Sequence, residues 1–275
     1  MHEITTKDIL YSERMSEAKI YLLLDINYYS NIQQDIYPLI IDNDWVPIFC
    51  NSPYKHLLDT SPLLIKVKPC NAQLIEDVMK RLSGIIVTSS CGLSTLQEIL
   101  IDILTVESDD NREGTCFLRY FTPITATSLL KNYNSLFIEQ LDAIAVPDYT
   151  RESWLLHDKL AVKSKPSPLI TVQFKETIEN ERMAYYLGYF NRWKAVSKSS
   201  LSKVALSLNI LLRTNDINNK TLKKWEYLLL SATDVIDHHY WFNLLEQDLA
   251  IEDKWNQACF LIDTIRHKKG LINEK

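Results

Sequence analysis

Apolar and polar positions in the first part of the chain alternate between short strand-like and helix-like patterns. Residues 20–26, IYLLLDI, form an almost continuous apolar run, which is typical of a strand buried on both faces. Comparable short runs predict further strands at 45–49, 63–67, 84–88, 143–146 and 153–157. Apolar residues at helical spacing predict helices at 31–43, 73–82, 93–104, 124–130 and 135–141, and residues 1–18 an arm or short helix. This order of elements indicates a mixed α/β lobe.

The pattern changes after about residue 160. Helical periodicity dominates and predicts helices at 175–193, 198–212, 220–239 and 251–267, while strand signals nearly vanish. The segment 162–168, VKSKPSP, is rich in proline, serine and lysine and is the best candidate linker. We therefore expect two domains, an α/β lobe of residues 1–160 and a mainly helical C-terminal lobe of residues 161–275.

Residues 104–123, LTVESDDNREGTCFLRYFTP, predict a β-hairpin with a polar turn at 108–114 and a return strand at 115–121. Period-two alternation would place Cys116, Leu118 and Tyr120 on one face and Phe117, Arg119 and Phe121 on the other. A guanidinium between two phenylalanines stacks on the rings, pairs with a carboxylate or reaches a backbone carbonyl. Two interpretations of Arg119 stay open: an arginine satisfied inside the fold, and a contact for a partner.

Composition and charge narrow the function classes. Of the 275 residues, 46% are hydrophobic and 24% charged, as in an ordinary soluble protein, and the net charge of −5 comes without a dense basic cluster. That charge pattern argues against nucleic acid as the main ligand. The chain has only five glycines and neither GxGxxG nor GxxxxGK[ST], which argues against a nucleotide cofactor.

Cysteine usage and hydropathy indicate a compartment. The five cysteines are odd in number and never in CxxC spacing, so a reducing environment fits better than a disulfide framework or a structural zinc site. The polar N-terminus lacks the apolar core of a signal peptide, and no run approaches the roughly 18 apolar residues of a membrane helix. We expect a cytoplasmic protein without membrane insertion.

Two groups are candidates for chemistry. Cys91 follows a predicted strand at a helix start, where a thiol is activated, but the turn departs from G-x-S-x-G because position 88 is threonine, and no histidine partner can be assigned. Asp234 and His238 fall at i, i+4 on the predicted helix 220–239 and could share a metal ion. His239 would point about 100° away from His238, and no third ligand has a recognisable spacing. The alternative readings are a small residue at a helix start and a charged helix end.

Five aromatic residues on the predicted helix 175–193 form one broad face. They are Tyr185, Tyr186, Tyr189, Phe190 and Trp193, at i, i+1, i+4, i+5 and i+8. Such a face usually belongs to a core or packs between lobes. Tyrosine and tryptophan are also favoured at interfaces that stay partly polar, so partner binding is the second interpretation.

Several ordered motifs resemble a known family. They are Leu24-Asp25 at the end of the first predicted strand, Ser61-Pro62-Leu63-Leu64, and Leu118-Arg119-Tyr120-Phe121 followed by Pro123. Over about residues 20–148 the chain resembles the adaptor, or effector-chaperone (Tap/TEC-type), family of bacterial type VI secretion, long catalogued as a domain of unknown function. It departs from that family at Thr122, where aspartate is expected, and at 99–102, where basic residues are common.

The resemblance implies a non-enzymatic cytoplasmic adaptor that needs no cofactor. Such a protein binds a toxin effector and helps to load it onto the VgrG spike protein, which sometimes carries a PAAR tip. The partner-binding candidates are Arg119, Tyr120, Phe121 and Pro123 in the motif, and Tyr185, Tyr186, Tyr189, Phe190 and Trp193 in the aromatic set. The alternatives are a hydrolase-type enzyme that uses Cys91 or the Asp234 and His238 group, and an immunity protein that neutralises a toxin.

Overall fold

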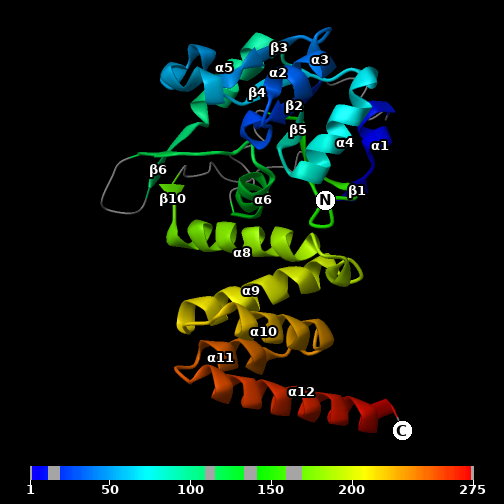
Figure 1. Cartoon of the computed structure of the whole chain (residues 1–275), viewed down its shortest axis with the longest axis vertical. Coiled ribbons are helices and arrows are strands. Elements are labelled where there is room, and N and C mark those ends of the chain that lie inside the picture. Colours follow the sequence, from blue (N-terminus) through cyan, green and yellow to red (C-terminus); the bar gives the residue numbers. More distant parts are fainter. Residues whose placement is uncertain (1, 12–18, 109–114, 133–140, 159–168, 274–275) are drawn as a thin grey trace. The chain divides into compact units, whose positions relative to one another are not determined.

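The structure, a computed structural model, describes residues 2–11, 19–108, 115–132, 141–158 and 169–273 (Figure 1). The chain divides into two compact units, Met1–Ile178 and Glu179–Lys275. The first unit holds an antiparallel sheet with helices and the second is mostly helical, which confirms the predicted fold class. The predicted linker at 162–168, the hairpin turn at 109–114 and all but the last residue of the helix predicted at 135–141 lie outside the described residues.

In the described part of the first unit, seven strands form the main sheet in the order β1-β9-β8-β5-β2-β4-β3, with every neighbouring pair antiparallel. The strands are β1 (His2–Ile4), β2 (Lys19–Leu24), β3 (Trp45–Pro47), β4 (Leu63–Lys66), β5 (Gly84–Ser89), β8 (Ala143–Pro147) and β9 (Trp154–Asp158). Strand β2 lies inside the sheet next to the middle strand β5, and its Leu23 pairs with Leu64 on one side and Ile85 on the other.

Both faces of this sheet are covered, which explains the continuous apolar run of β2. Successive side chains point to opposite faces, so Tyr21 and Leu23 join one hydrophobic core and Leu22 and Leu24 the other. The first core includes residues of α5 (Leu93–Asp102), α6 (Pro123–Asn132) and the start of α8 (Val172–Gly188). The second includes residues of α1 (Thr6–Tyr11), α2 (Ile32–Asp35), α3 (Tyr37–Ile40) and α4 (Ala72–Arg81).

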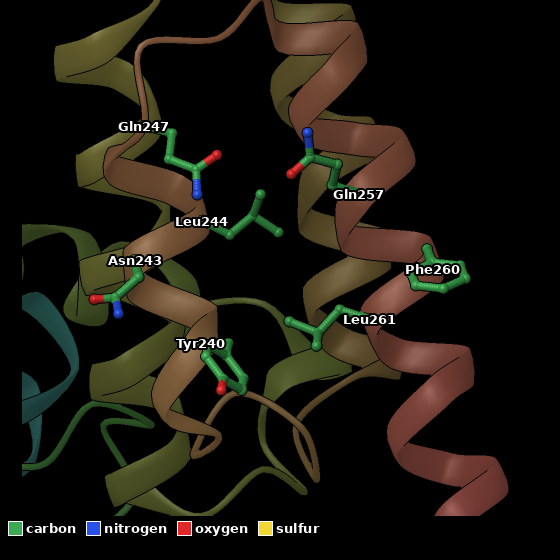
Figure 2. A pocket seen from close by; sticks show the side chains of 7 residues that line it. All are labelled: Tyr240, Asn243, Leu244, Gln247, Gln257, Phe260 and Leu261. Carbon is green, nitrogen blue, oxygen red and sulfur yellow. The ribbon is translucent and has the colours of Figure 1, made fainter.

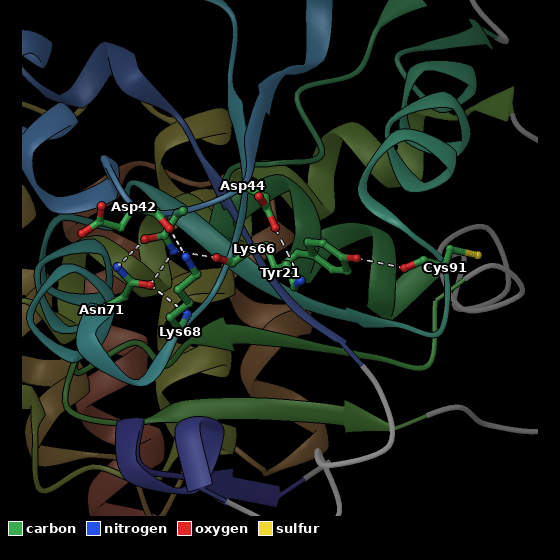
Figure 3. A network of polar contacts seen from close by, with 8 residues as sticks. Tyr21, Asp42, Asp44, Lys66, Lys68, Asn71 and Cys91 are labelled. Atoms are coloured by element: carbon green, nitrogen blue, oxygen red, sulfur yellow. Dashed lines mark hydrogen bonds and ion pairs between the residues drawn. The ribbon is translucent and has the colours of Figure 1, made fainter.

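Short 3₁₀ helices connect these elements. They are η2 (Ile26–Tyr28), η3 (Ile48–Asn51), η4 (Lys55–Thr60) and η5 (Pro69–Asn71). A polar network holds the turn after α3 against the start of α4 (Figure 3). In it, Asn43 Nδ2 donates to Lys66 O at 2.6 Å and to Asn71 Oδ1 at 2.7 Å. The helix predicted at 31–43, which Pro38 was expected to kink or to bound, forms two short helices, α2 and α3, with the break at Ile36, two residues before Pro38.

A second, three-stranded sheet contains the predicted hairpin. Strands β6 (Thr105–Ser108) and β7 (Thr115–Phe117) pair antiparallel, and β10 (Leu169–Ile170) pairs parallel to β6. The return strand ends at Phe117, not at Phe121 as predicted. A hydrogen bond from Thr122 N to Arg119 O at 3.1 Å closes a turn there, and the chain then enters α6.

The second unit is built from helices. They are the end of α8, the 3₁₀ helix η6 (Asn191–Trp193), α9 (Lys198–Thr214), α10 (Asn219–Ser231), α11 (His239–Glu246) and α12 (Ile251–Asn273), and α9 to α12 lie in successive layers (Figure 1). Side-chain oxygens of Ser197 and Asn218 cap α9 and α10. The helix predicted at 220–239 is wrong beyond Ser231, where α10 ends.

Tryptophans and one lysine hold these helices together. Trp193, Trp225 and Trp241 are fully buried, and Trp241 Nε1 donates to Ser207 Oγ at 3.0 Å. The Lys254 side chain, also buried, donates to Thr214 Oγ1 at 2.9 Å and to Leu245 O at 2.7 Å. Lys254 lies in the first turn of α12, and its ammonium group binds at the C-terminal ends of α9 and α11, where helix dipoles favour positive charge. Burial lowers the pKa of Lys254.

Candidate functional site

An ion pair joins two sequence motifs that lie 94 residues apart. Arg119 Nη2 donates to Asp25 Oδ2 at 2.5 Å. The Asp25 side chain is 0% exposed, while that of Arg119 is 51% exposed. The arginine therefore compensates a buried carboxylate and still presents part of its guanidinium to solvent.

Local structure fixes the carboxylate. Asp25 follows β2 directly and caps η2, because its Oδ1 accepts from Asn27 N at 3.1 Å and from Asn27 Nδ2 at 2.8 Å. Its backbone N–H donates to Ser83 O at 2.7 Å. With both carboxylate oxygens and the backbone amide bonded, Asp25 is held rigidly as the partner of Arg119.

The aromatic neighbours of Arg119 do not lie as the alternation pattern predicts. Because β7 ends at Phe117, the side chain of Phe121 turns into the core with that of Tyr120, whose hydroxyl donates to Leu100 O at 2.8 Å. The guanidinium carbon of Arg119 lies 5.8 Å from the ring centroid of Phe121. Phe117 stays partly exposed and packs on Tyr54, with ring centroids 4.8 Å apart.

Thr122 and Pro123 start the helix that follows the motif. Pro123 is buried at the first position of α6, a position that tolerates its missing N–H. The Thr122 carbonyl accepts from Ala126 N at 2.9 Å, and its Oγ1 donates to Arg119 O at 3.1 Å. Threonine thus serves as the residue before the helix without the aspartate that the resemblance leads one to expect.

Tyr28 and Arg151 lie near the same ion pair. Burial raises the pKa of Tyr28, the Asp25 carboxylate raises it further, and the guanidinium groups of Arg119 and Arg151 lower it. Arg151 adopts a left-handed backbone, with φ of 62°, in the connection between β8 and β9. We call Tyr28, Arg119 and Arg151 the Arg119 surface.

The predicted aromatic face divides into two groups. Helix α8 ends at Gly188, so the five residues do not share one helical face as predicted. Tyr185 and Trp193 are buried in the core, while Tyr186 and Tyr189 are exposed, Tyr189 by 61%. Phe190 contacts both exposed rings at centroid distances of 5.1 and 5.6 Å, and the guanidinium carbon of Arg192 lies 4.9 Å from its ring centroid.

Cys91 sits at the predicted strand–helix junction, between β5 and α5. Its backbone N–H donates to Ser89 Oγ at 3.2 Å, and its carbonyl accepts from Tyr21 Oη at 2.8 Å (Figure 3). The side chain packs at the edge of the first core. Within the described residues the thiol makes no hydrogen bond, to a histidine or to any other group.

The Asp234 and His238 pair is not one helical site. His238 is the residue before α11 and Asp234 lies in the preceding turn, where it pairs with Arg266 Nη2 at 3.0 Å. Asp237 pairs with Lys203, and the His238 ring stacks on that of His239 at 4.6 Å. No cluster of three or more potential metal ligands exists among the described residues.

The pairing of Asp25 with Arg119 is the feature that sequence reasoning missed. A carboxylate was one of three partners expected for Arg119, and Leu24-Asp25 was noted as a motif, but nothing linked the two. The sequence signal that could have indicated the pair is an aspartate directly after an apolar strand. A carboxylate at such a position is expected to be buried and therefore to need a cationic partner.

Comparison with known proteins identifies one domain. Residues 20–136 match a family described as a domain of unknown function (DUF4123), a range that includes both Asp25 and Arg119. No curated protein and no solved structure matches the chain. Among the described residues, no helix combines the length and the apolar composition that a membrane crossing requires.

Proposed function

We propose that the protein is a non-enzymatic cytoplasmic adaptor, or chaperone, of type VI secretion. It binds a toxin effector and helps to load it onto the VgrG spike protein, which in some systems carries a PAAR tip. Support comes from the ordered motifs in residues 20–136, which also match the domain of unknown function. The proposal requires no cofactor and no catalytic residue.

The Asp25–Arg119 pair is the observation that supports particular residues as the partner-binding surface. Only one hydrogen bond from the Arg119 guanidinium forms within the described residues, so most of its five N–H donors are free to bind a partner. Arginine and tyrosine are the residues most enriched at energetically dominant interface positions. With Tyr28 beside it, the Arg119 surface suits a carboxylate or a backbone carbonyl of the partner.

The two exposed tyrosines of the second unit suit a protein partner as well. Tyr186 and Tyr189 project from the end of α8 and the turn that follows it, packed edge-on against Phe190. Tyrosine gives a large contact area with a polar tip, which fits a reversible interface. We assign them to partner contact and Tyr185 and Trp193 to the core.

Co-expression tests the proposal. The chain is produced with the toxin and the VgrG protein encoded beside its gene, and copurification is followed together with toxin delivery by a deletion strain. We expect copurification with the toxin and loss of its delivery on deletion. Failure to copurify with either protein, together with unchanged delivery, would refute the proposal.

Variants of the Arg119 surface locate the contact. Arg119→Lys keeps the charge opposite Asp25 and loses the planar fork, so it should weaken toxin binding while the thermal melt stays close to that of the wild type. Arg81→Lys is the matched control, because Arg81 forms an exposed pair with Asp77 one turn away on α4. Equal binding by both variants would remove Arg119 from the interface.

A further inference from the structure

The second unit has an open groove between α11 and α12. Seven residues line a cavity of about 240 Å³ (Figure 2): Tyr240, Asn243, Leu244, Gln247, Gln257, Phe260 and Leu261. Leu244 and Leu261 extend toward each other across the space between the helices, and Gln247 and Gln257 stand opposite each other nearer the turn (Figure 2). The volume is smaller than that of pockets for drug-sized ligands and fits one or two large side chains.

The lining is unusual for a surface that only water contacts. Phe260 is 74% exposed and Tyr240 is 57% exposed, so two large rings border an apolar floor. The side-chain amides of Asn243, Gln247 and Gln257 form no hydrogen bond within the described residues and are free to donate and accept. Aromatic rings at the border, an apolar floor and unpaired amides together resemble the composition of a protein interface.

The spacing of the lining residues suits a helix as the occupant. On α11 they fall at 240, 243 and 244, followed by the C-cap residue 247, and on α12 at 257, 260 and 261, so each helix presents one stripe. Two neighbouring stripes form a valley into which the ridge of a third helix packs. Helix α11 already packs against both α9 and α12, and a further helix in the groove would extend that packing.

The charges near one end of the groove indicate how a bound helix would be oriented. No charged residue lines the cavity, but Asp248 lies in the turn next to Gln247, and Asp253 lies one helical turn before Gln257. Asp248 interacts with the buried Lys254 cation, whereas Asp253 and the neighbouring Glu252 form no ion pair within the described part of the chain, so negative charge remains in excess. The end of the groove beside the 247–250 turn is therefore acidic and favours lysine or arginine.

We propose that this groove binds an amphipathic helix of a partner protein, with a large apolar side chain in the cavity and lysine or arginine beside Asp248 and Asp253. The proposal does not depend on the type VI secretion assignment. It rests on the cavity, the unpaired amides and the acidic end of the groove.

Binding of designed peptides to the full chain tests it. The probe is a fluorescein-labelled helical peptide of about 15 residues, with leucine or tryptophan at i, i+4 and i+7 and lysines at one end, followed by anisotropy. We expect saturable binding that Phe260→Ala weakens about tenfold. Asp253→Lys should weaken it at least about threefold, an effect that grows at low salt.

Matched controls distinguish peptide binding in the groove from nonspecific binding elsewhere on the surface. Glu252→Lys makes the same charge change about 100° around α12, and Tyr227→Ala removes an exposed ring from α10; both should bind as the wild type does. A peptide with proline at its centre, and one with glutamates in place of the lysines, should bind much more weakly.

Several results would overturn the proposal. They are no saturable binding by any lysine-ended peptide, unchanged binding by Phe260→Ala, and equal binding of the proline-containing peptide. Sedimentation velocity adds another: a wild-type dimer that Phe260→Ala converts to a monomer would show that a second copy of the chain occupies the groove.

Discussion

Arg119 and Asp25 illustrate how unequal the two members of one ion pair can be. The carboxylate is fully buried and already bonded to Asn27, while the guanidinium is half-exposed. Removing the arginine leaves a buried carboxylate that has only the neutral donors of Asn27 and no countercharge, whereas removing the aspartate leaves an arginine that water can solvate. The order of the two effects follows from burial alone.

Arg119→Ala should therefore lower the free energy of unfolding by about 3–5 kcal/mol, and Asp25→Ala by only about 1–2 kcal/mol, mainly through the lost cap of η2. Denaturant unfolding of both variants measures this difference. The double variant should be more stable than Arg119→Ala alone. If the two single variants lose equal stability, or the double variant loses the sum, the pair does not act as described.

Buried tyrosines make stability depend on alkaline pH. Tyr120 is fully buried and donates to Leu100 O, and burial raises its pKa well above the ordinary value; burial raises the pKa of Tyr29 as well. In the unfolded chain these hydroxyls ionise near pH 10, so the unfolded state loses protons that the folded state keeps. Stability should therefore fall as the pH rises above about 10.

Tyr120→Phe should reduce that fall by up to about 1.4 kcal/mol per pH unit, while it costs about 1 kcal/mol at neutral pH through the lost hydrogen bond. Unfolding curves at several pH values between neutrality and pH 11 provide the measurement. The exposed Tyr227→Phe is the control and should leave the slope unchanged. An unchanged slope in Tyr120→Phe would contradict the account.

At the scale of elements, close approach of β5 to β2 depends on a glycine. A Cβ at Gly84 would lie 2.3 Å from Leu23 O and 3.2 Å from Val78 Cγ1. The obstructing atom belongs to the backbone of β2, which is hydrogen-bonded to strands on both sides, so it cannot turn aside. A Cβ at Gly92, by contrast, meets nothing within 4 Å.

Gly84→Ala should lower the free energy of unfolding by about 2 kcal/mol or more, and Gly92→Ala should change it by about 0.5 kcal/mol at most. Thermal or urea unfolding compares the two. Near-equal stability of the two variants would mean that the β2–β5 pair can separate to admit a side chain.

The end of α8 at Gly188 places Tyr189 and Trp193, which were predicted to lie on one helical face, in different environments. Trp193 is fully buried in η6, so Trp193→Ala should cost about 3–5 kcal/mol. Tyr189→Ala should change stability by about 0.5 kcal/mol at most, because its side chain is mostly exposed, and should weaken partner binding. Melting curves beside copurification distinguish the two roles. Unfolding of Tyr189→Ala would place that residue in the core.

Apolar periodicity predicted most elements but not their ends. Strands β2, β4, β5, β8 and β9 and helices α4, α5, α9 and α12 were predicted within a few residues, because burial of whole faces imposes the pattern. The pattern also continued through Tyr120, Phe121 and Trp193, which are buried but lie beyond the ends of β7 and α8. Gly188 was the available signal for the end of α8.

Long-range pairing was beyond sequence reasoning. The pattern showed that Arg119 needed a partner, yet only the three-dimensional course of the chain brings Asp25 to it across 94 residues. The cavity between α11 and α12 was missed for a related reason. Its α11 side belongs to a helix that was not predicted, because the expected helix 220–239 ends where α11 begins and residues 240–250 were assigned to no element.

For the molecule as a whole, the two compact units offer separate surfaces for partners. The first presents the Arg119 surface within the matched domain, and the second presents Tyr186 and Tyr189 and the groove between α11 and α12. An adaptor that joins a toxin to a spike protein needs two binding surfaces. The proposed function therefore uses both units, and variants in one should leave binding by the other intact.

Isothermal titration of the purified chain with the toxin effector encoded beside its gene is the decisive test of the adaptor function. We expect saturable binding that Arg119→Lys weakens about tenfold while its melting temperature stays close to that of the wild type. No binding to the toxin or to the VgrG protein, under conditions where the chain is folded, would show that the protein is not an adaptor for them.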